Sequence, residues 1–364
     1  MIKWSAMTNG KIVMILSGFP RRSETFALNE VLALEQRDAL AGIFATKAGE
    51  TTGIQPAASR LASRVQILPA GTPQEQASFV LQRLNGEEIS GVHGYFAHAP
   101  AEVAAHVACQ LKKPYGFSVH ARDARKVSSD VLARRANNAA CVVACNSDVA
   151  QAISASGARV HLIPHGVDLQ HFQPAPFPPC RPLRILAVGR LVEKKGFHIL
   201  LAAAARMRLP FTLCIVGEGP EQARLAALIA SHRLADRVTL CGAKTHEELV
   251  VEYNRAHVLA APSVVDRGGD RDGLPNVILE AMACGRAVIA SDAGAIVSAV
   301  ADGDTGLLVP QGDAESLTAA FESLASQPEL LCALGKSGRK LVESQYEVGS
   351  CTERFCGVLR EAYA

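Results

Sequence analysis

The segment "HFQPAPFPPCRP", from His171 to Pro182, divides this sequence into two parts. It holds five prolines in twelve residues. Proline lacks the backbone N–H that the interior of a helix or a strand needs, and its φ is fixed. We therefore predict a linker, placed at residues 176–182. Because the same alternation of elements runs on both sides of this segment, its position decides the fold.

Short apolar runs alternate with longer helical patterns on each side of the linker. The run "KIVMILSG" (11–18) precedes the helical pattern "SETFALNEVLALEQR" (23–37), and "RILAVGR" (184–190) starts the alternation again. Strands that alternate with helices predict βαβ units in a parallel sheet, and unbroken runs of Val, Ile and Leu fit strands covered on both faces. We expect an α/β protein with two doubly wound, Rossmann-like sheets that face a central cleft.

The predicted boundaries follow from the linker and from the total length. A chain of 364 residues suits two domains better than one core. We place the first domain at 1–175 and the second at 183–345. Residues 346–364 are expected to form a helical segment that packs back on the first domain.

Composition excludes several classes of protein. The net charge of +2 argues against nucleic acid as a partner. The ten cysteines include no CxxC pair, so we expect buried thiols, Cys214 and Cys241 among them, and neither disulfides nor zinc ligands. The sequence contains no run of about 18 apolar residues, so we predict no membrane-spanning helix. We expect a cytoplasmic protein that can also lie peripherally on a membrane.

Two glycine-rich nucleotide motifs are missing from the sequence. The stretch "GEGP" (217–220) begins like a dinucleotide fingerprint, but Gln222 occupies the position of its third glycine. A tight turn with Pro220 in the first turn of a helix is the simpler interpretation. A phosphate-binding loop of the G-x-x-x-x-G-K-[ST] type is also missing, so we expect neither a dinucleotide cofactor nor ATP hydrolysis.

The stretch "AVGRLVEKKG" (187–196) places two cations after the first strand of the second domain. Arg190 follows the strand directly, and Lys195 precedes a helix. Such a pair suits a diphosphate, because Arg can bind it in a bidentate manner and Lys as a point charge. Two solvated basic residues are the alternative.

The stretch "DRDGLPNVILEAMACG" (270–285) predicts a helix from about Asn276 to Ala283 with a carboxylate on each side of its start. The N-terminus of such a helix favours an anion. Because an acid would repel a phosphate there, we expect Asp272 and Glu280 to accept hydrogen bonds from sugar hydroxyls. The alternative is an N-cap-like Asp272 and an exposed Glu280. The D-x-D pattern at Asp270–Asp272 resembles a metal motif, but we predict no metal.

Motifs along nearly the whole chain resemble family-four retaining glycosyltransferases with the GT-B fold. In the second domain these are "GRLVEKKG", "PS" at 262–263, "DGLPNVILEAMACGRAVIASDAGA" and "DGDTGLLVPQGD". In the first domain, "FPRRSETFALNEVLALE" (19–35), "HGYFAHAPAEVA" (93–104) and "PYGFSVHARD" (114–123) are similar to exopolysaccharide enzymes of the colanic-acid type.

The resemblance implies a donor site in the second domain and an acceptor site in the first. The donor would be a UDP- or GDP-sugar, and no further cofactor is implied. Arg190 and Lys195 would bind the diphosphate, Glu280 the ribose, and Asp272 the donor sugar, with His120 against the reacting centre. Glycines and backbone near the donor complete this implied set: Gly18, Gly189, Gly273, Leu274, Pro275 and Asn276.

The acceptor side is implied by the segment from Arg21 to Glu30. Arg21, Arg22, Glu24 and Thr25 would face a saccharide or a lipid-linked saccharide, although Arg21 and Arg22 could equally be solvated. We interpret His93 and His98 as structural, and His165 as the end of the last strand before the linker.

Two departures from the family pattern concern the donor. Asp272 stands where the family usually has Glu, one methylene longer. After "DAG" the family often has a Glu, whereas Ala295–Ser298 follow here. We expect a retaining hexosyltransferase that needs no metal. The alternatives are a sugar-nucleotide 2-epimerase and a nucleotide-sugar binding protein without catalysis.

Overall fold

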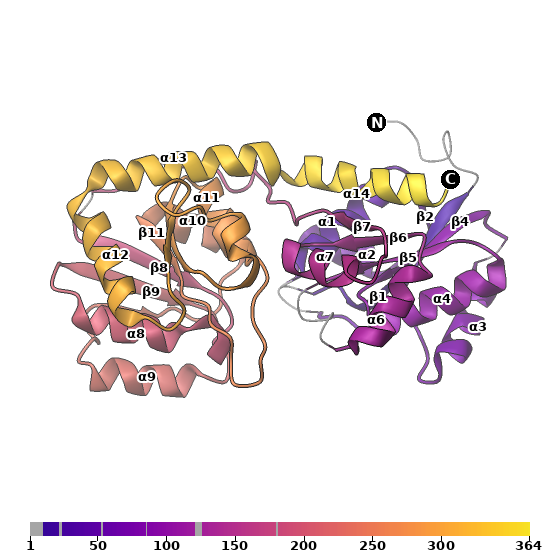
Figure 1. Ribbon diagram of the computed structural model, residues 1–364, viewed down its shortest axis with the longest axis horizontal. Coiled ribbons are helices and arrows are strands. Elements are labelled where there is room, and N and C mark those ends of the chain that lie inside the picture. The colour runs from indigo at the N-terminus through magenta and orange to yellow at the C-terminus, as the bar shows by residue number, and fades with distance from the viewer. Residues whose placement is uncertain (1–9, 22–23, 52–53, 85, 121–125, 180) are drawn as a thin grey trace. The chain divides into compact units, whose positions relative to one another are not determined.

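A computed structural model describes residues 10–21, 24–51, 54–84, 86–120, 126–179 and 181–364 (Figure 1). The chain divides into two compact units. Unit 1 comprises residues 1–166 and 348–364, and unit 2 comprises residues 167–347. Each unit is a parallel sheet covered by helices, as the alternating pattern predicts.

The sheet of unit 1 has seven parallel strands in the order β3-β2-β1-β4-β5-β6-β7. Its order places β4 beside β1, so the chain winds outward in both directions from the middle of the sheet. The strands are β1 (Lys11–Phe19), β2 (Leu40–Ala48), β3 (Val65–Ile67), β4 (Ile89–Tyr95), β5 (Tyr115–Val119), β6 (Cys141–Ala144) and β7 (Val160–Leu162). The helices are α1 (Thr25–Glu35), α2 (Pro56–Ala62), α3 (Pro73–Arg83), α4 (Ala99–Leu111), α6 (Ser129–Asn137), α7 (Ser147–Ser154) and α14 (Val348–Ala362).

Strand β1 shows why this sheet is covered on both faces. Ile12 and Met14 pack into a core that α1 and α14 complete, whereas Val13 and Ile15 pack into another core under α3 and α4. Successive side chains of a strand point to opposite faces. An unbroken apolar run therefore supplies both cores at once.

The sheet of unit 2 has six parallel strands in the order β10-β9-β8-β11-β12-β13. They are β8 (Leu183–Val188), β9 (Phe211–Val216), β10 (Val238–Leu240), β11 (Val258–Ala261), β12 (Ala287–Ser291) and β13 (Leu307–Val309). The helices are α8 (Phe197–Arg206), α9 (Gln222–Ser231), α10 (His246–Arg255), α11 (Asn276–Ala283), α12 (Ala314–Ser326) and α13 (Pro328–Gln345), with short 3-10 turns at Glu193–Lys195 and Gly294–Ser298.

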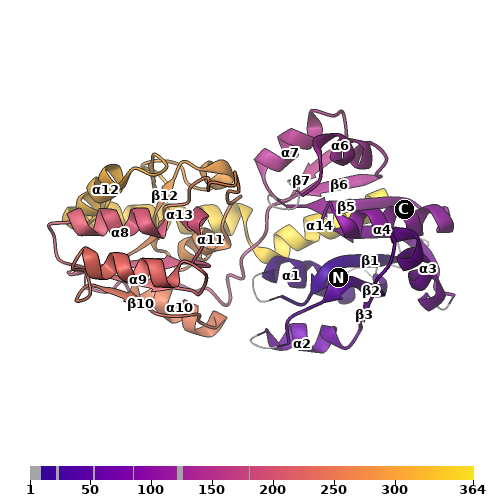
Figure 2. The same cartoon turned by 90° about the horizontal axis from the view of Figure 1, so that it is seen from below.

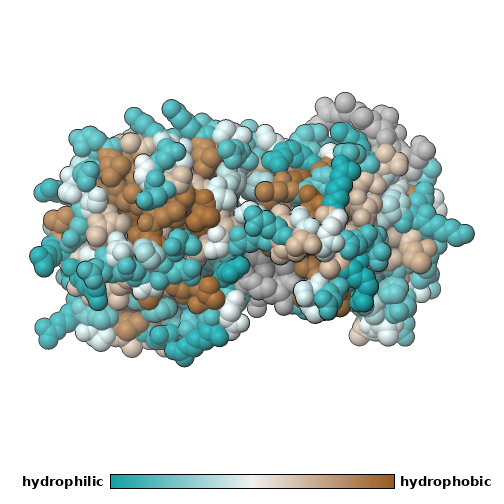
Figure 3. Space-filling view, viewed as in Figure 1, coloured by the Kyte–Doolittle hydropathy of each residue, from teal (hydrophilic) through white to brown (hydrophobic). Residues whose placement is uncertain are grey.

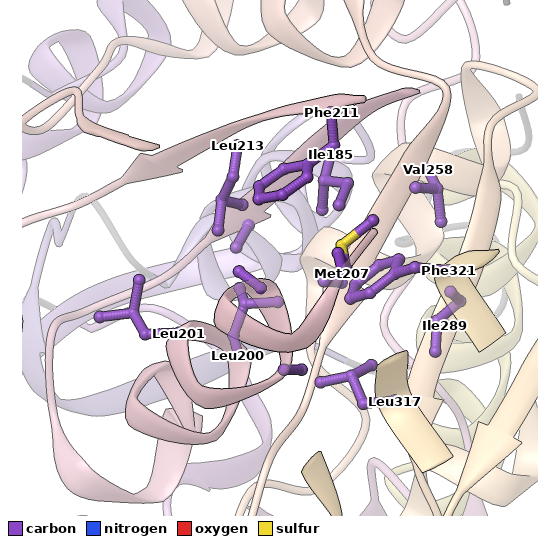
Figure 4. Close-up of a cluster of buried hydrophobic side chains, with 14 of the residues drawn as sticks. Ile185, Leu200, Leu201, Met207, Phe211, Leu213, Val258, Ile289, Leu317 and Phe321 are labelled. Atoms are coloured by element: carbon purple, nitrogen blue, oxygen red, sulfur yellow. The ribbon is translucent and has the colours of Figure 1, made fainter. Parts of the chain in front are cut away.

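One core of unit 2 lies between this sheet and helices α8 and α12. Ile185 and Leu213 of the sheet meet Leu200 of α8 and Phe321 of α12 (Figure 4). The composition is rich in small aliphatic residues and has only 5% aromatics. Aliphatic side chains therefore fill most of this core.

The boundary between the units differs from the predicted linker. Val167 and Phe172 are buried in a core of unit 2 together with Tyr253 and Ile278, and the N–H of Val167 donates to the carbonyl of Tyr346 at 2.8 Å. Residues 167–175 therefore belong to unit 2 rather than to the first domain. Proline content alone marked a later boundary because it takes no account of this packing.

The C-terminal helix α14 lies in unit 1, where Phe355 and Leu359 join the core beside α1. Tyr363 follows the helix, and its ring occupies the place that a Cβ on Gly91 would take, 2.4 Å from the ring carbon Cγ. The residue at 91 must therefore be glycine for the C-terminus to close against β4.

The prediction that the cysteines form no disulfide is wrong for one pair. Cys214 on β9 and Cys241 after β10 are bonded to each other. The two strands are neighbours, with Cys214 opposite Thr239 in the register. Two thiols 27 residues apart in the sequence thus meet across adjacent strands, a proximity that only the sheet order reveals.

Hydrophilic and hydrophobic side chains are mixed on the face of the molecule in Figure 3. Within the described residues, no helix combines the length and the apolar character that crossing a bilayer requires. The large hydrophobic side chains that are exposed are scattered along the chain: Ile67, Leu162, Val251, Val265 and Val297.

Candidate active site

Two loops at the carboxyl edge of the second sheet are held together by a glycine. Gly196 has φ +66°, and a Cβ there would lie 1.8 Å from the carbonyl oxygen of Pro262. Beside this contact, the N–H of Val264 donates to the carbonyl of Lys194 at 2.8 Å. Only glycine allows both the backbone conformation and the close approach. The loop that carries the lysines is thus fixed against the loop that follows β11.

A cluster of charges fills the space between these loops and the start of α11. The ammonium of Lys195 lies 2.7 Å from Asp272 Oδ2. The ammonium of Lys194 lies 3.1 Å from Asp270 and 3.4 Å from Asp272. The hydroxyl of Ser263 donates to Asp272 at 2.9 Å. We call Lys194, Lys195, Asp270 and Asp272 the ion cluster.

Asp272 is the centre of the ion cluster. Burial alone would raise its pKa, but Lys195, Lys194 and the hydrogen bond from Ser263 outweigh burial and hold the pKa of Asp272 below its usual range. Asp272 is therefore ionised at neutral pH. The alternative of an N-cap is wrong, because this carboxylate pairs with lysines and α11 has no side-chain cap from a described residue.

Lys194 was missed by the sequence analysis, although it is the more buried of the two lysines. The motif "EKK" offers two adjacent cations, and nothing in it tells which one turns inward. Arg190, in contrast, is exposed and forms no ion pair with any described residue. A Cβ at Gly189 would lie 3.2 Å from Cε of Lys195, so glycine there leaves room for the lysine side chain.

Helix α11 spans the predicted residues and begins beside the ion cluster. Pro275 is its N-cap with φ −66° and ψ 130°. The first turn of a helix has N–H groups without helical partners and a partial positive charge. Gly273, Leu274, Pro275 and Asn276 are partly exposed, so this helix start can receive an anion.

Glu280 lies inside α11 and is buried, which overturns the alternative of an exposed acid. The hydroxyl of Tyr253 on α10 donates to Glu280 Oε2 at 2.7 Å. Burial raises the pKa of Glu280 to about 7, although this hydrogen bond and the nearby His171 oppose the rise. Tyr253 was not anticipated, because its position in the helical pattern resembles that of any core aromatic.

A second group of residues lies at the carboxyl edge of the first sheet. His120 directly follows β5, and its ring lies 5.0 Å from that of Phe26, 5.3 Å from that of Tyr95 and 4.9 Å from that of Phe96. Burial, helped by the neighbouring His165, holds the pKa of His120 well below its usual value. The imidazole of His120 is therefore neutral at pH 7.

His165 belongs to the same group, which the sequence analysis did not foresee. Its ring stacks on Phe26 with centroids 3.8 Å apart and planes 3° apart, and lies 5.1 Å from the ring of His120. Cys145, which follows β6, completes a set of three metal-ligand types with the two histidines. We call His120, His165 and Cys145 the histidine–cysteine group.

The predicted acceptor segment combines basic and acidic side chains where it is described. Arg21 lies 3.4 Å from Glu24, whose pKa burial raises despite the opposing charge of Arg21. Thr25 begins α1, and Arg22 lies outside the described residues. Burial together with Arg21 and Lys126 lowers the pKa of Lys47. Lys47 and Lys126 thus belong to a basic group that the sequence analysis did not identify.

Gly18 lies at the end of β1, close to this segment. A Cβ there would be 3.1 Å from the carbonyl oxygen of Ala48 and 3.3 Å from Nη2 of Arg21. The interpretation of His93 as structural is confirmed, because its ring is buried and both nitrogens are bonded, to the Tyr363 hydroxyl and the Ser118 hydroxyl at 2.9 Å each.

Both units match sequence families that are defined by glycosyl transfer. Residues 172–341 match the family described as glycosyl transferases group 1, and residues 24–171 match glycosyltransferase family 4. This chain belongs to those glycosyltransferases. The resemblance seen in the sequence motifs is thereby confirmed.

Several relatives of this glycosyltransferase are named for polysaccharide biosynthesis. WcaL of Escherichia coli K12, named for colanic acid biosynthesis, is 36% identical over 188 residues, 50% of this chain and 46% of WcaL. The amylovoran biosynthesis glycosyltransferase AmsK of Erwinia amylovora is 33% identical over 169 residues, 46% of this chain and 42% of AmsK. The chain spans about half the length of these curated relatives.

Solved structures share the fold of this glycosyltransferase. Anabaena HepE in complex with UDP aligns with a TM-score of 0.82 at 19% identity, over 96% of this chain and 100% of HepE. Sucrose-phosphate synthase of Thermosynechococcus elongatus aligns with a TM-score of 0.76 at 23% identity, over 97% and 99% of the two chains. The expected GT-B fold, with two parallel-sheet domains, is thereby confirmed.

Proposed function

We propose that this glycosyltransferase moves a hexose from a UDP- or GDP-sugar to a saccharide or lipid-linked saccharide, with retention of the anomeric configuration and without a metal ion. One observation carries the proposal: the ion cluster places two lysines and a buried carboxylate beside the start of α11. The names of WcaL and AmsK support a role in polysaccharide assembly.

The donor diphosphate binds at the start of α11 in this proposal. Lys195 and Arg190 supply positive charge, and the backbone from Gly273 to Asn276 supplies N–H groups. Lys194 stays with the two aspartates and keeps Asp272 in position. The ribose hydroxyls bind to Glu280, whose other oxygen is fixed by Tyr253.

The proposed reaction exchanges one bond at the anomeric carbon for another on the same face of the sugar. The bond from this carbon to the leaving phosphate oxygen breaks, and the bond to the acceptor oxygen forms. A phosphate oxygen of the donor takes the acceptor's proton. Lys195, Arg190 and the helix N–H groups stabilise the negative charge on the diphosphate, so no metal ion is required for that purpose.

His120 and Asp272 hold the reacting sugar in this scheme. Because the imidazole of His120 is neutral, it can hydrogen-bond a sugar hydroxyl without repelling the positive charge that develops on the ring. Asp272 is ionised, accepts hydrogen bonds from sugar hydroxyls and stabilises that same charge.

The acceptor is proposed to bind unit 1 near Arg21, Glu24 and Thr25. Arg21, Lys47 and Lys126 suit an acceptor with a phosphate, such as a lipid diphosphate. Such an acceptor would bring the protein to the surface of a membrane.

The decisive experiment compares Lys195→Ala with Lys336→Ala in a transfer assay. Lys336 lies exposed on α13 and is a matched control. Loss of Lys195 should lower kcat/KM by about 100-fold or more, as the removal of one preorganised charge-stabilising group does elsewhere. Equal turnover by both variants would refute the diphosphate assignment.

Further measurements test the metal independence, the retention of configuration and the two alternative functions. Activity should survive EDTA, and the anomeric configuration of the product should match that of the donor by NMR. A donor that binds in calorimetry but is never transferred would favour the binding protein without catalysis, for which the missing acid at Ala295 is the motive. Release of an epimerised sugar without an acceptor would favour the 2-epimerase.

A further inference from the structure

The histidine–cysteine group is built by three neighbouring strands of unit 1. His120 directly follows β5, Cys145 directly follows β6, and His165 lies three residues after β7. Figures 1 and 2 show these strands side by side. The register places Val119 opposite Ala144 and Ala144 opposite Leu162. All three side chains therefore come from the same edge of the sheet.

The ligand atoms of this group are close enough to share one ion. One ring nitrogen from each histidine and the sulfur of Cys145 all lie within 4.8 Å of one another. Two imidazoles and a thiolate are ligands that Zn²⁺ binds in a tetrahedral arrangement. A fourth position stays available for water or for an oxygen of a substrate.

Hydrogen bonds around Cys145 fix the position of its sulfur. The side-chain amide of Asn146 donates to the sulfur at 3.3 Å. Asn146 is itself fixed, because its Oδ1 caps α7 by accepting from the N–H of Val149 at 3.1 Å. Cys145 also lies at the N-terminus of α7, where the helix dipole stabilises a negative charge. A residue such as Asn146, which hydrogen-bonds a metal ligand without touching the metal, commonly orients that ligand and alters its affinity for the metal.

Neighbouring aromatic rings hold the two histidines in place. His165 is stacked against Phe26, and His120 lies between the rings of Phe26 and Phe96. The aromatic rings limit the rotation of both imidazoles, so little conformational entropy is lost when an ion binds.

We propose that His120, Cys145 and His165 form a site for Zn²⁺, and that occupancy of this site inhibits sugar transfer. The inhibition rests on the proposed function, because it requires that His120 bind the donor sugar. The metal site itself does not. The proposed site goes against the expectation that the cysteines include no zinc ligand.

Metal binding is tested on the full chain after treatment with EDTA and removal of the chelator. Titration with Zn²⁺ in a calorimeter should give one tight site per chain. Cys145→Ser and His165→Ala should each weaken this site by at least about tenfold. Cys109→Ser, which removes an exposed thiol on α4, should leave it unchanged. Equal zinc affinity in all four proteins, or no binding, would overturn the proposal.

Cobalt provides a readout that does not depend on activity. Co²⁺ bound to a thiolate gives a sulfur-to-metal charge-transfer band in the near ultraviolet. This band should appear in the natural chain and in Cys109→Ser, and should be missing in Cys145→Ser. A band that survives in Cys145→Ser would assign the metal to other cysteines and refute the site.

Inhibition is tested separately from binding. Zn²⁺ should suppress transfer by the natural chain, and EDTA should restore it. Cys145→Ser should need at least about tenfold more Zn²⁺ for the same suppression. If zinc binds but transfer is unaffected, the inhibitory role is wrong and the site stands. If no donor is ever transferred, the proposed function fails while the calorimetry and the cobalt spectrum still decide the metal site.

Discussion

The two units place opposite kinds of chemistry at the carboxyl edges of similar sheets. Unit 2 has the ion cluster, in which two lysines face two aspartates. Unit 1 has histidines and aromatic rings, with His120 kept neutral by burial. In the proposed function the ion cluster handles the charged leaving diphosphate and, through Asp272, also the sugar, whereas the uncharged His120 serves the sugar alone.

The largest effect should follow from removing the centre of the ion cluster. Asp272→Ala leaves the nearly buried Lys194 with Asp270 as its acidic partner. Breaking a buried pair commonly costs about 3 kcal/mol or more, and we expect the free energy of unfolding to fall by about that amount, as measured in urea. We also expect kcat/KM to fall by about 100-fold or more, because the sugar loses its charged partner.

Asp304→Ala removes an exposed acid of unit 2 and serves as the control. If Asp272→Ala matched this control in both stability and transfer, the ion cluster would have no role. Asp272→Glu sharpens the test, since it keeps the charge and restores the length usual in the family. A changed preference among donors would show that the shorter acid touches the sugar.

A smaller effect distinguishes the units through their buried acids. Burial raises the pKa of Glu30 in unit 1 to about 8 and that of Glu280 in unit 2 to about 7. A carboxyl with a raised folded-state pKa favours folding while it is protonated, so its contribution is lost as the pH rises through that value. Histidines with lowered pKa values act in the opposite direction up to about pH 7.5, because their unfolded-state imidazoles, with pKa values of about 6.5, are still partly protonated there. The contribution of each acid is therefore measured as the difference between the natural chain and its Gln variant.

Between pH 6.5 and 8, Glu30 should lower the free energy of unfolding by about 1–2 kcal/mol and Glu280 by less, each relative to a chain that lacks the acid. Urea titrations at both pH values measure this fall. Glu30→Gln should flatten most of it, whereas Glu88→Gln, an exposed control, should not. A fall of the same size in Glu30→Gln would mean that this acid is not its source.

The smallest expected effect concerns the basic residues of unit 1. Arg21→Ala should raise KM for an acceptor with a phosphate by about three- to tenfold and leave the binding of donor unchanged, because a partly exposed charge contributes modestly. The difference should shrink at high salt. Arg60→Ala, exposed on α2, is the control. An unchanged KM at low salt would identify Arg21 as a solvated residue.

The sequence allowed a good prediction of helix α11 and of the charged residues near its start, because these parts are short motifs. The bounds of α11 and the places of Lys195 and Asp272 depend on local rules for prolines, glycines and helix starts. Lys194 was missed because its inward direction depends on the contact between Gly196 and the carbonyl of Pro262. No local pattern shows that contact.

The histidine–cysteine group was harder to predict for a related reason. His120, Cys145 and His165 meet only because β5, β6 and β7 are adjacent and parallel. The sequence predicts strands and their direction, but not which strands are neighbours. The disulfide between Cys214 and Cys241 was missed on the same ground.

The return of α14 to unit 1 has a consequence for the order in which the chain becomes a folded protein. Phe355, Leu359 and Tyr363 complete the core of unit 1, yet a ribosome adds them only after residues 167–347 of unit 2. The whole of residues 167–347 emerges before them, and domains commonly fold as they emerge. Unit 2 can thus fold first, while unit 1 is incomplete until α14 has been synthesised.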